Sequence, residues 1–223
     1  MAEGPAAARD EVAALLNMMQ RVLGREHPDT LTTRSELAKL TGEAGDAAAA
    51  RDQYAALLPV LARVLGREHP DTLTAWGELA RWTGEAGNAA AARDQFAALV
   101  PVRERLLGLG HPRTLAARNN LAHWTGQAGD PEAAWDQYAR LVPIYEHVFG
   151  PEHPRTLNVR ANLAAWIGAA GESAEASNQY AELLPVHERI LGPEHPDTLA
   201  VRQNLAFWTR QAGKRRRRWR RQK

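Results

Sequence analysis

The sequence predicts an all-α fold of stacked helical hairpins, and three observations support this class. A His-Pro pair recurs every 42 residues without insertion. These pairs begin at His27, His69, His111, His153 and His195. Apolar residues within each interval recur at steps of three and four, the period of one helix face, and Pro and Gly stand where helices would start and stop. A fixed period of this length indicates a solenoid, in which each unit buries its apolar face against its neighbours.

The first helix of the first complete unit is expected from Pro28 to about Thr41. Pro28 suits the first helical position, because the backbone N–H that proline lacks would have no partner there. Asp29 adds a negative charge near the positive end of the helix dipole. The segment TGEAGD then ends the helix, since Gly42 and Gly45 can adopt the left-handed conformation found at helix C-termini.

The second helix of the unit follows at once and should end at Gly66. Asp46 is its predicted N-cap. The equivalent capping positions of the later units hold Asn88, Asp130 and Glu172. One apolar stripe along this helix is formed by Ala47, Ala50, Tyr54, Leu57 and Leu61. Pro59 lies inside the pattern and is expected to kink the helix, a bend that would recur in each complete unit.

Further columns of residues keep the same register. An aromatic column consists of Tyr54, Phe96, Tyr138 and Tyr180, and a polar column of Gln53, Gln95, Gln137 and Gln179. Leu40 is followed by Trp82, Trp124, Trp166 and Trp208. We interpret the Trp column as core packing between adjacent helices, with a groove wall as the alternative. Trp76 and Trp135 stand off this column and are candidates for exposed contacts.

The register also divides the chain into segments. Residues 1–26 align with a second helix alone, and residues 27–194 hold four complete repeats. Residues 195–213 then form a first helix alone, which makes about ten helices in all. Residues 214–223 are expected to be a basic, disordered tail, because the Arg run starts where the next capping residue should stand.

The repeat unit resembles the tetratricopeptide repeat in several features. These are a Leu-Ala pair in the first helix, a Gly-x-x-Gly-Asp turn, and small residues followed by Tyr in the second helix. The usual unit of that family has 34 residues. The longer unit here, with LGxEHPxTL and NLA, is similar to the kinesin-light-chain type, which also occurs in many bacterial regulators. The resemblance covers roughly residues 5–213 and implies a right-handed α–α superhelix of antiparallel helices. HEAT-like repeats are the alternative, but they explain the Gly-Asp turn and the aromatic column less well.

The resemblance further implies a concave groove, lined by the first helices, that binds peptides. Its candidate residues lie around the Leu-Ala pair of each first helix and one turn beyond it. They are Asn119, Asn120, Asn162, Asn204, Lys39, Arg81 and His123. Asn side chains can both donate to and accept from an extended peptide backbone. Glu36 and Glu78 depart from the family's Asn column, so the first two repeats should differ in what they bind. The alternative is that all these residues are simply solvated.

The C-terminal segment carries a concentrated positive charge. It holds eight of the 28 Lys and Arg residues, which leaves 20 against 26 Asp and Glu in the body. The candidates for polyanion contact are Arg215, Arg216, Arg217, Arg218, Trp219, Arg220 and Arg221. The arginines could neutralise phosphates, and Trp219 could stack on an unpaired base. We therefore predict weak, salt-sensitive and non-specific binding of nucleic acid. The alternatives are a solubility tail, or an accidental end of a truncated or frame-shifted array.

The composition argues against several other functions. The chain has no Cys, which removes disulfides and thiolate metal sites. The five His-Pro histidines belong to different repeats and cannot converge on one zinc ion, so a structural role at the turn between repeats is expected. Neither a phosphate loop, a dinucleotide fingerprint nor a catalytic triad is recognisable. We therefore predict a non-enzymatic, cytoplasmic protein without metal, cofactor, signal peptide or membrane span.

The sequence as a whole predicts an interaction scaffold whose groove binds a peptide or an unknown partner protein. One alternative is a sensor fragment of a larger bacterial signalling NTPase regulator. Another is a nucleic-acid-associated protein that acts through its Arg-rich tail. The half-repeats at the two ends also predict partly uncovered apolar residues, Phe207 and Trp208 among them. Such patches favour head-to-tail association between copies.

Overall fold

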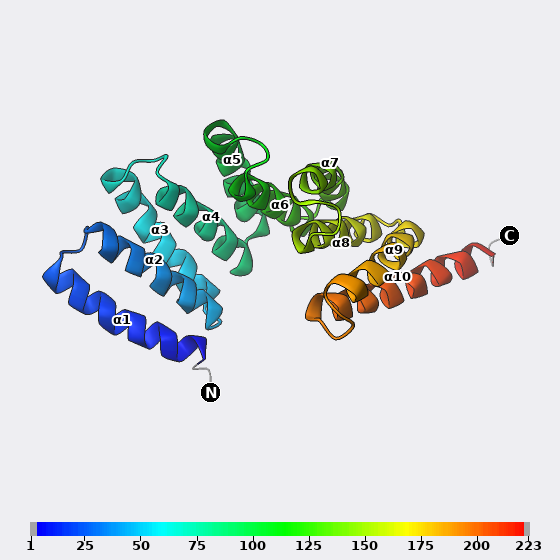
Figure 1. Cartoon of the computed structure of the whole chain (residues 1–223), viewed down its shortest axis with the longest axis horizontal. Coiled ribbons are helices and arrows are strands. Elements are labelled where there is room, and N and C mark those ends of the chain that lie inside the picture. The colour runs from blue at the N-terminus through cyan, green and yellow to red at the C-terminus, as the bar shows by residue number, and fades with distance from the viewer. Residues whose placement is uncertain (1–3, 221–223) are drawn as a thin grey trace. The chain divides into compact units, whose positions relative to one another are not determined.

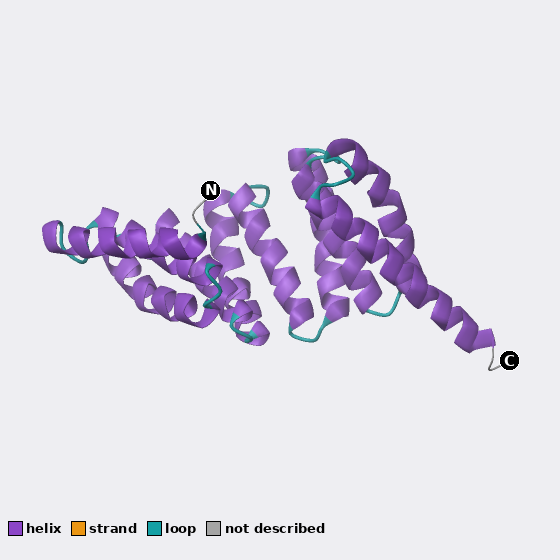
Figure 2. Cartoon of the chain, turned by 90° about the horizontal axis from the view of Figure 1, so that it is seen from below, coloured by secondary structure: helices purple, strands orange, loops and turns teal. Residues whose placement is uncertain are grey.

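The computed structural model describes residues 4–220, and this part of the chain consists of ten α-helices without a strand (Figure 1). Figure 2 shows the helices joined only by short loops. The side chains of residues 215–220 lie outside the described part, as does the whole of Arg221. The predicted all-α class and the predicted helix number are thus confirmed for these residues.

The helices fall into two units, residues 1–108 and residues 109–223. The first unit contains α1 (Pro5–Val22), α2 (Pro28–Glu43), α3 (Ala47–Val64), α4 (Pro70–Glu85) and α5 (Ala89–Leu107). The second contains α6 (Pro112–Gln127), α7 (Pro131–Phe149), α8 (Pro154–Ala169), α9 (Ser173–Ile190) and α10 (Pro196–Arg220). Within each unit successive helices pack together, and the first helices of neighbouring repeats also touch: α2 with α4, α6 with α8, and α8 with α10.

Each first helix begins in the same way, with histidine as the N-cap and proline at the first helical position. The imidazole Nδ1 of His27 accepts a hydrogen bond from the backbone N–H of Asp29. The same bond recurs at His69, His111, His153 and His195. Each histidine thereby satisfies one of the backbone donors that a helix start leaves without a partner. The predicted structural role of the His-Pro column is confirmed.

The second helices are capped as predicted in three of four repeats. The side chains of Asp46, Asn88 and Asp130 accept from the backbone N–H three residues on, at 2.9–3.1 Å. The side chain of Glu172, the predicted cap of the fourth repeat, makes no capping bond. Glutamate is one methylene longer than aspartate, so its carboxylate does not match the short geometry of the N-cap. Glu172 thus stands at the predicted N-cap position of α9, but its side chain does not cap the helix.

The two glycines of the first turn have different roles. Gly45 has φ near 101°, the left-handed conformation that the sequence predicts at the helix end. Gly42 instead lies inside α2, where a Cβ atom would stand 2.4 Å from the indole ring of Trp82. Gly126 meets Trp166 and Gly168 meets Trp208 in the same manner. The absence of a side chain at Gly42 thus makes room for the tryptophan of the next first helix.

Tyrosine and glutamine columns bind the two helices of a repeat to each other. The hydroxyl groups of Tyr54, Tyr138 and Tyr180 donate to the carbonyl oxygens of Ser35, Asn119 and Ala161 on the first helix. The Gln column donates to a threonine hydroxyl at the end of the first helix in three repeats, through Gln53, Gln95 and Gln137. Ile167 stands at the threonine position in the fourth repeat, and Gln179 donates to Glu175 instead.

One predicted boundary differs from the structure. The second helices do continue past their internal prolines as predicted, since α3 runs past Pro59 to Val64. The sequence predicts that the last helix ends near Gly213 and that a disordered segment follows, but α10 continues through Gly213 to Arg220. Lys and Arg are good helix formers, so the basic sequence can extend a helix that is already nucleated.

Gly126→Ala should destabilise the fold, because the new Cβ would overlap the Trp166 ring. Overpacking of a close contact of this kind costs about 1–3 kcal/mol. Urea denaturation followed by circular dichroism measures the change, and a Trp166→Leu background serves as the control. We expect the alanine to cost much less in that background; an equal cost in both would show that Trp166 is not what the glycine accommodates.

Tyr54→Phe should lower the stability at neutral pH by about 1 kcal/mol, since it removes one buried hydrogen bond. Burial raises the pKa of Tyr54 from 10.0 to about 12, against a smaller opposite effect of its hydrogen bond to Ser35. The stabilisation from a raised pKa is complete below pH 10 and is lost as the pH rises through about 12.

The melting temperature of Tyr54→Phe should therefore fall less steeply than that of the parent between pH 10 and pH 12. Ser35→Ala is the control, because the Ser35 carbonyl, which accepts the bond, is kept. A parallel fall in all three proteins would contradict the assignment.

Candidate functional site

A pocket of about 330 Å³ opens in the second unit between the first helices α8 and α10. Helix α8 contributes Asn158, Ala161, Asn162 and Ala165, and helix α10 contributes Asp197, Ala200, Val201 and Asn204. These positions recur at steps of three and four, so each helix turns one face towards the pocket. Tyr180 and His187 of the second helix α9 complete the lining. The pocket is thus built from one repeat and the first helix that follows it.

Polar contacts join the three helices around this pocket. The hydroxyl of Tyr180 donates to the carbonyl of Ala161 at 2.8 Å, which fixes α9 against α8. Ser177 contacts Thr209 near one end of α9, and Glu188 pairs with Arg202 near the other. Later residues of α9 therefore meet earlier residues of α10, and the two helices are antiparallel. Burial raises the pKa of Tyr180, so its hydroxyl stays a donor even at a pH at which an exposed tyrosine would ionise.

Two of the predicted groove residues, Asn162 and Asn204, line this pocket together. Asn162 also approaches Asn119 of α6, with 3.5 Å between its Nδ2 and the Asn119 Oδ1. Asn120 lies half-buried on α6, at the position equivalent to Asn162, but is not part of the pocket lining. A carboxamide offers two donors and one acceptor, so this face presents neutral groups that can bind either side of a peptide bond.

The predicted residue His123 lies against aromatic rings. Its ring centroid is 4.9 Å from that of Trp124 and 6.2 Å from that of Trp166, both edge-on. His123 therefore extends the packing of the Trp column on α6. It does not reach the pocket between α8 and α10, whose lining comes from other residues.

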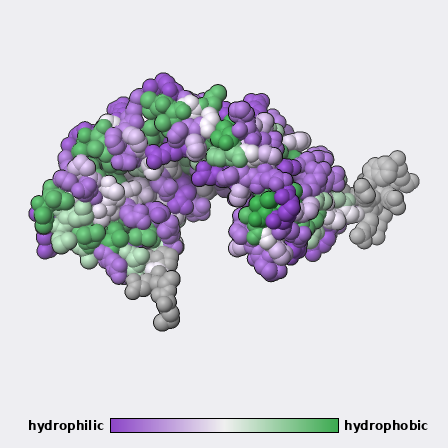
Figure 3. All heavy atoms as spheres, viewed as in Figure 1, coloured by the Kyte–Doolittle hydropathy of each residue, from purple (hydrophilic) through white to green (hydrophobic). Residues whose placement is uncertain are grey.

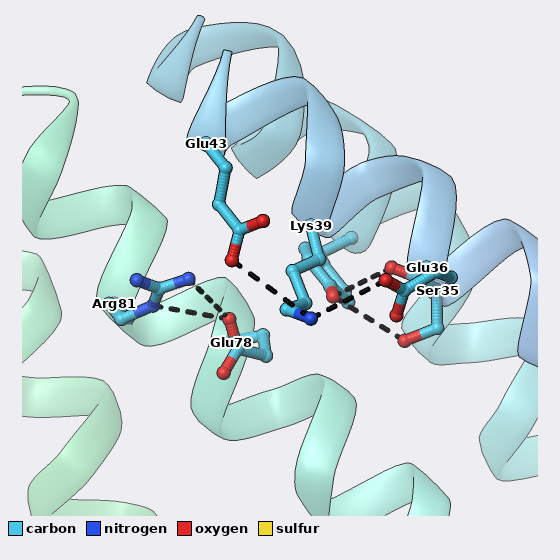
Figure 4. A network of polar contacts seen from close by, with 7 residues as sticks. Ser35, Glu36, Lys39, Glu43, Glu78 and Arg81 are labelled. Atoms are coloured by element: carbon cyan, nitrogen blue, oxygen red, sulfur yellow. Dashed lines mark hydrogen bonds and ion pairs between the residues drawn. The ribbon is translucent and has the colours of Figure 1, made fainter. Parts of the chain in front are cut away.

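The equivalent positions in the first unit are charged and already paired. Figure 4 shows the Lys39 ammonium between the carboxylates of Glu36 and Glu43, at 3.4 and 4.0 Å. On the next first helix the Arg81 guanidinium binds Glu78 at 2.9 Å. Arg81 also lies 3.9 Å from the centroid of the Trp82 ring, a cation–π contact.

The predicted groove residues thus differ in chemistry between the two units. Lys39 and Arg81 belong to intrahelical ion pairs of the first unit, whereas Asn119, Asn120, Asn162 and Asn204 belong to the second unit. The carboxylates at Glu36 and Glu78, which depart from the Asn column, are the partners of those two cations. A peptide bound at Glu36 or Glu78 would have to compete with an existing ion pair.

Sequence reasoning missed a buried column in the second helices, which contributes His187 to the pocket lining. Leu61, Arg103, Tyr145 and His187 are separated by the repeat length, and all four are buried. Arg103 donates from Nη2 to the carbonyl of Leu73 at 2.9 Å and lies beside Gly77, where a Cβ would be 3.3 Å from it. The sequence shows that the residue type changes along this column. It does not show that these residues are buried against the first helices.

Apolar residues remain exposed on the terminal helices. Figure 3 shows hydrophobic patches over α1, where Leu15, Met18 and Val22 are exposed, as is Leu23 directly after the helix. Phe207 on α10 is 42% exposed, and Trp208 beside it is half-buried. The described residues thus agree with the predicted partial exposure of the Phe207–Trp208 pair.

Neither a metal-binding cluster nor a membrane-spanning helix occurs among the described residues. No group of three or more His, Asp or Glu side chains within residues 4–220 is placed to hold a metal ion. No helix in that range combines the length and the hydropathy needed to cross a membrane.

Solved structures with a similar fold include repeat proteins of the kinesin-light-chain kind. A protein of Podosopora anserina with nearly identical TPR-like repeats, assigned to the kinesin light chains, is 27% identical, with a TM-score of 0.72 over 86% of this chain and 90% of that chain. A variant of that protein gives 24% identity and a TM-score of 0.73, over 83% and 87% of the two chains. BtubC (BKLC) of P. vanneervenii is 19% identical, with a TM-score of 0.75 over 95% and 85%.

Comparison with curated protein sequences gives no match. The family model of the tetratricopeptide repeat matches four times in succession, at residues 30–71, 72–113, 114–155 and 156–197. These matches have the same period as the His-Pro column and cover most of the chain. Together with the helical hairpins and their capping, they show that the chain belongs to the tetratricopeptide repeat family.

Proposed function

We propose that this protein is a non-enzymatic scaffold that binds an extended peptide segment of a partner protein along α8 and α10. Tetratricopeptide repeats generally serve protein–protein interaction, and that general role holds for this chain. The observation that carries the more specific proposal is the pocket of about 330 Å³ lined by Asn158, Asn162 and Asn204. Its neutral amide groups lie on α8 and α10, which pack with α9 around a core of Leu157, Ala164, Tyr180, Leu183 and Val201.

The chemistry of the pocket suits a peptide backbone. An extended peptide presents N–H and C=O groups that have lost water and need new partners. The three carboxamides can supply both donors and acceptors, and the small side chains of Ala161, Ala165 and Ala200 leave room beside them. Because the helices are already packed, binding costs the scaffold little conformational entropy.

The first unit favours a different role from the second. Its groove positions carry the Glu36–Lys39 and Glu78–Arg81 pairs, whose side chains are partly exposed. Such pairs contribute little to stability, but a ligand would have to displace or match them. We therefore assign the peptide site to the second unit and leave the first unit as its support or as a separate, charged surface.

The paired replacement of Asn162 and Asn204 by Ala should weaken peptide binding strongly. Peptides selected from a random displayed library on the full-length protein provide the ligands, and fluorescence anisotropy measures their affinity. Each lost hydrogen bond of about 1 kcal/mol should weaken binding roughly fivefold, so that the double variant loses at least about twentyfold.

Gln203→Ala is the matched control, because Gln203 is exposed beside Asn204 but does not line the pocket. It should leave the affinity unchanged. Selected peptides that bind the double variant as tightly as the parent would overturn the site, and a library that yields no binder would overturn the function.

A further inference from the structure

The last two turns of α10 carry the most concentrated positive charge of the chain. Six of the seven residues from Lys214 to Arg220 are Lys or Arg, and Trp219 is the exception. All seven belong to the helix, since α10 runs from Pro196 to Arg220. Outside residues 214–223 the chain has 20 Lys and Arg against 26 Asp and Glu. An attraction for polyanions would therefore act mainly through residues 214–220, the basic segment of α10.

The basic segment extends past the helix that packs against α10. Ser177 on α9 contacts Thr209 on α10, and the two helices are antiparallel. Ser173, the first residue of α9, is therefore about level with Gly213. The next residue, Lys214, is exposed. Figures 1 and 2 both show the end of α10 projecting beyond α9, so this part of the helix is accessible to another molecule.

Local effects explain why the basic segment is helical. Lys and Arg are good helix formers, and positive charges near a helix C-terminus interact favourably with the helix dipole. Like charges four residues apart, as at Lys214 and Arg218, oppose the helix because they repel each other. A bound polyanion would neutralise these charges and remove the repulsion. The helical form and the binding of a polyanion should therefore support each other.

The distribution of the basic positions selects among polyanions. Successive residues of an α-helix are about 100° apart, so the six basic positions are spread around the whole circumference. Residues 214–220 therefore contain no apolar stripe, which a helix needs in order to lie on a membrane. The major groove of B-DNA is about 12 Å wide and admits an α-helix, with phosphates on both sides. Positive charge all around the helix thus suits duplex DNA better than a lipid surface.

The density of charge along the helix also matches that of a duplex. Seven residues of an α-helix are about 10 Å long. Duplex DNA carries one negative charge per about 1.7 Å of its axis, which gives about six charges over that length. The basic segment has six Lys and Arg residues. It can therefore neutralise about as many phosphates as lie along its own length.

We propose that the basic segment of α10 binds duplex DNA as a helix, by contacts to the phosphates that flank the major groove. Phosphate contacts carry no sequence information, so the binding is independent of sequence. Double-stranded RNA is a poorer partner, because the major groove of an A-form helix is deep and narrow. This site is separate from the peptide pocket, whose lining on α10 ends at Asn204.

The test measures the fluorescence anisotropy of a labelled DNA duplex of about 20 base pairs, titrated with the full-length protein. We expect a dissociation constant on the order of 10 µM in about 50 mM KCl. Neutralisation of about six phosphates should weaken binding about 10³-fold between about 50 and 200 mM KCl. Duplexes of different sequence should bind equally, and a double-stranded RNA of the same length at least about fivefold more weakly.

Replacement of the four consecutive arginines of the basic segment by Gln tests its charge. Gln is also a good helix former, so the helix should persist while DNA binding in about 50 mM KCl falls below detection. The matched control removes the same number of charges from exposed arginines elsewhere and should bind DNA at least as well as the parent. These control positions are Arg21, Arg25, Arg67 and Arg140.

Two variants of Gly213 separate the helix from the charge, because both keep every Lys and Arg. Gly213 lies inside α10, whereas the equivalent Gly45 and Gly171 have positive φ and follow helix ends. Gly213→Ala favours the helix and should strengthen DNA binding several-fold. Gly213→Pro interrupts the helix and should weaken DNA binding at least about fivefold. The melting temperature of each variant checks that the packed part of the protein is intact.

Other outcomes would overturn the inference. Equal affinity of Gly213→Pro and the parent would show that charge alone attracts DNA and that the helix has no part in binding. Tighter binding of single-stranded DNA that is lost in Trp219→Ala would show stacking on unpaired bases. Tighter binding of double-stranded RNA, or of vesicles with anionic lipid, would identify a different partner, and absence of any DNA binding would end the proposal. The peptide-binding function is unaffected by these results, because the Asn162 and Asn204 variants test it separately.

Discussion

The contact between tryptophan and glycine on neighbouring first helices is the constraint on which the rest of this structure depends. In every pair of first helices that touch within a unit, an indole ring lies where a glycine has no side chain, as at Gly42 with Trp82 and Gly168 with Trp208. This contact sets how closely first helices approach at their C-terminal ends. Between α8 and α10, Tyr180 and His187 of the second helix α9 line the pocket together with residues of both first helices.

The position of the helices was predictable from the sequence, because their start and stop signals are local. The histidine of the His-Pro pair caps a helix by accepting a hydrogen bond from the backbone two residues later. Asp46 caps the next helix by accepting one from the backbone three residues later. The role of Gly42 was not predictable in the same way, because its partner Trp82 is 40 residues away. A 42-residue register shows which positions are equivalent but does not show which columns touch each other.

The candidate site illustrates the same limit. The resemblance to the family led to Asn162 and Asn204, and the structure places both in one pocket. It did not lead to His187, since a buried histidine in a second helix looks no different in the sequence from the exposed His147. What distinguishes His187 is the combination of full burial, a bond from Nδ1 to the carbonyl of Leu183 and a buried Nε2 without a partner, and all three arise only after folding.

The two ends of the array follow from the same tryptophan–glycine rule. On α2 the position equivalent to the tryptophans holds Leu40. On α10 the position equivalent to the glycines holds the exposed Arg210. A second copy added after α10 in register would set Leu40 against Arg210, without an indole ring and without a side-chain gap to receive one. The apolar residues on α1 and the exposed Phe207 remain available for contact. Head-to-tail association would therefore have to use a packing different from the one inside each unit, with less apolar surface buried between first helices.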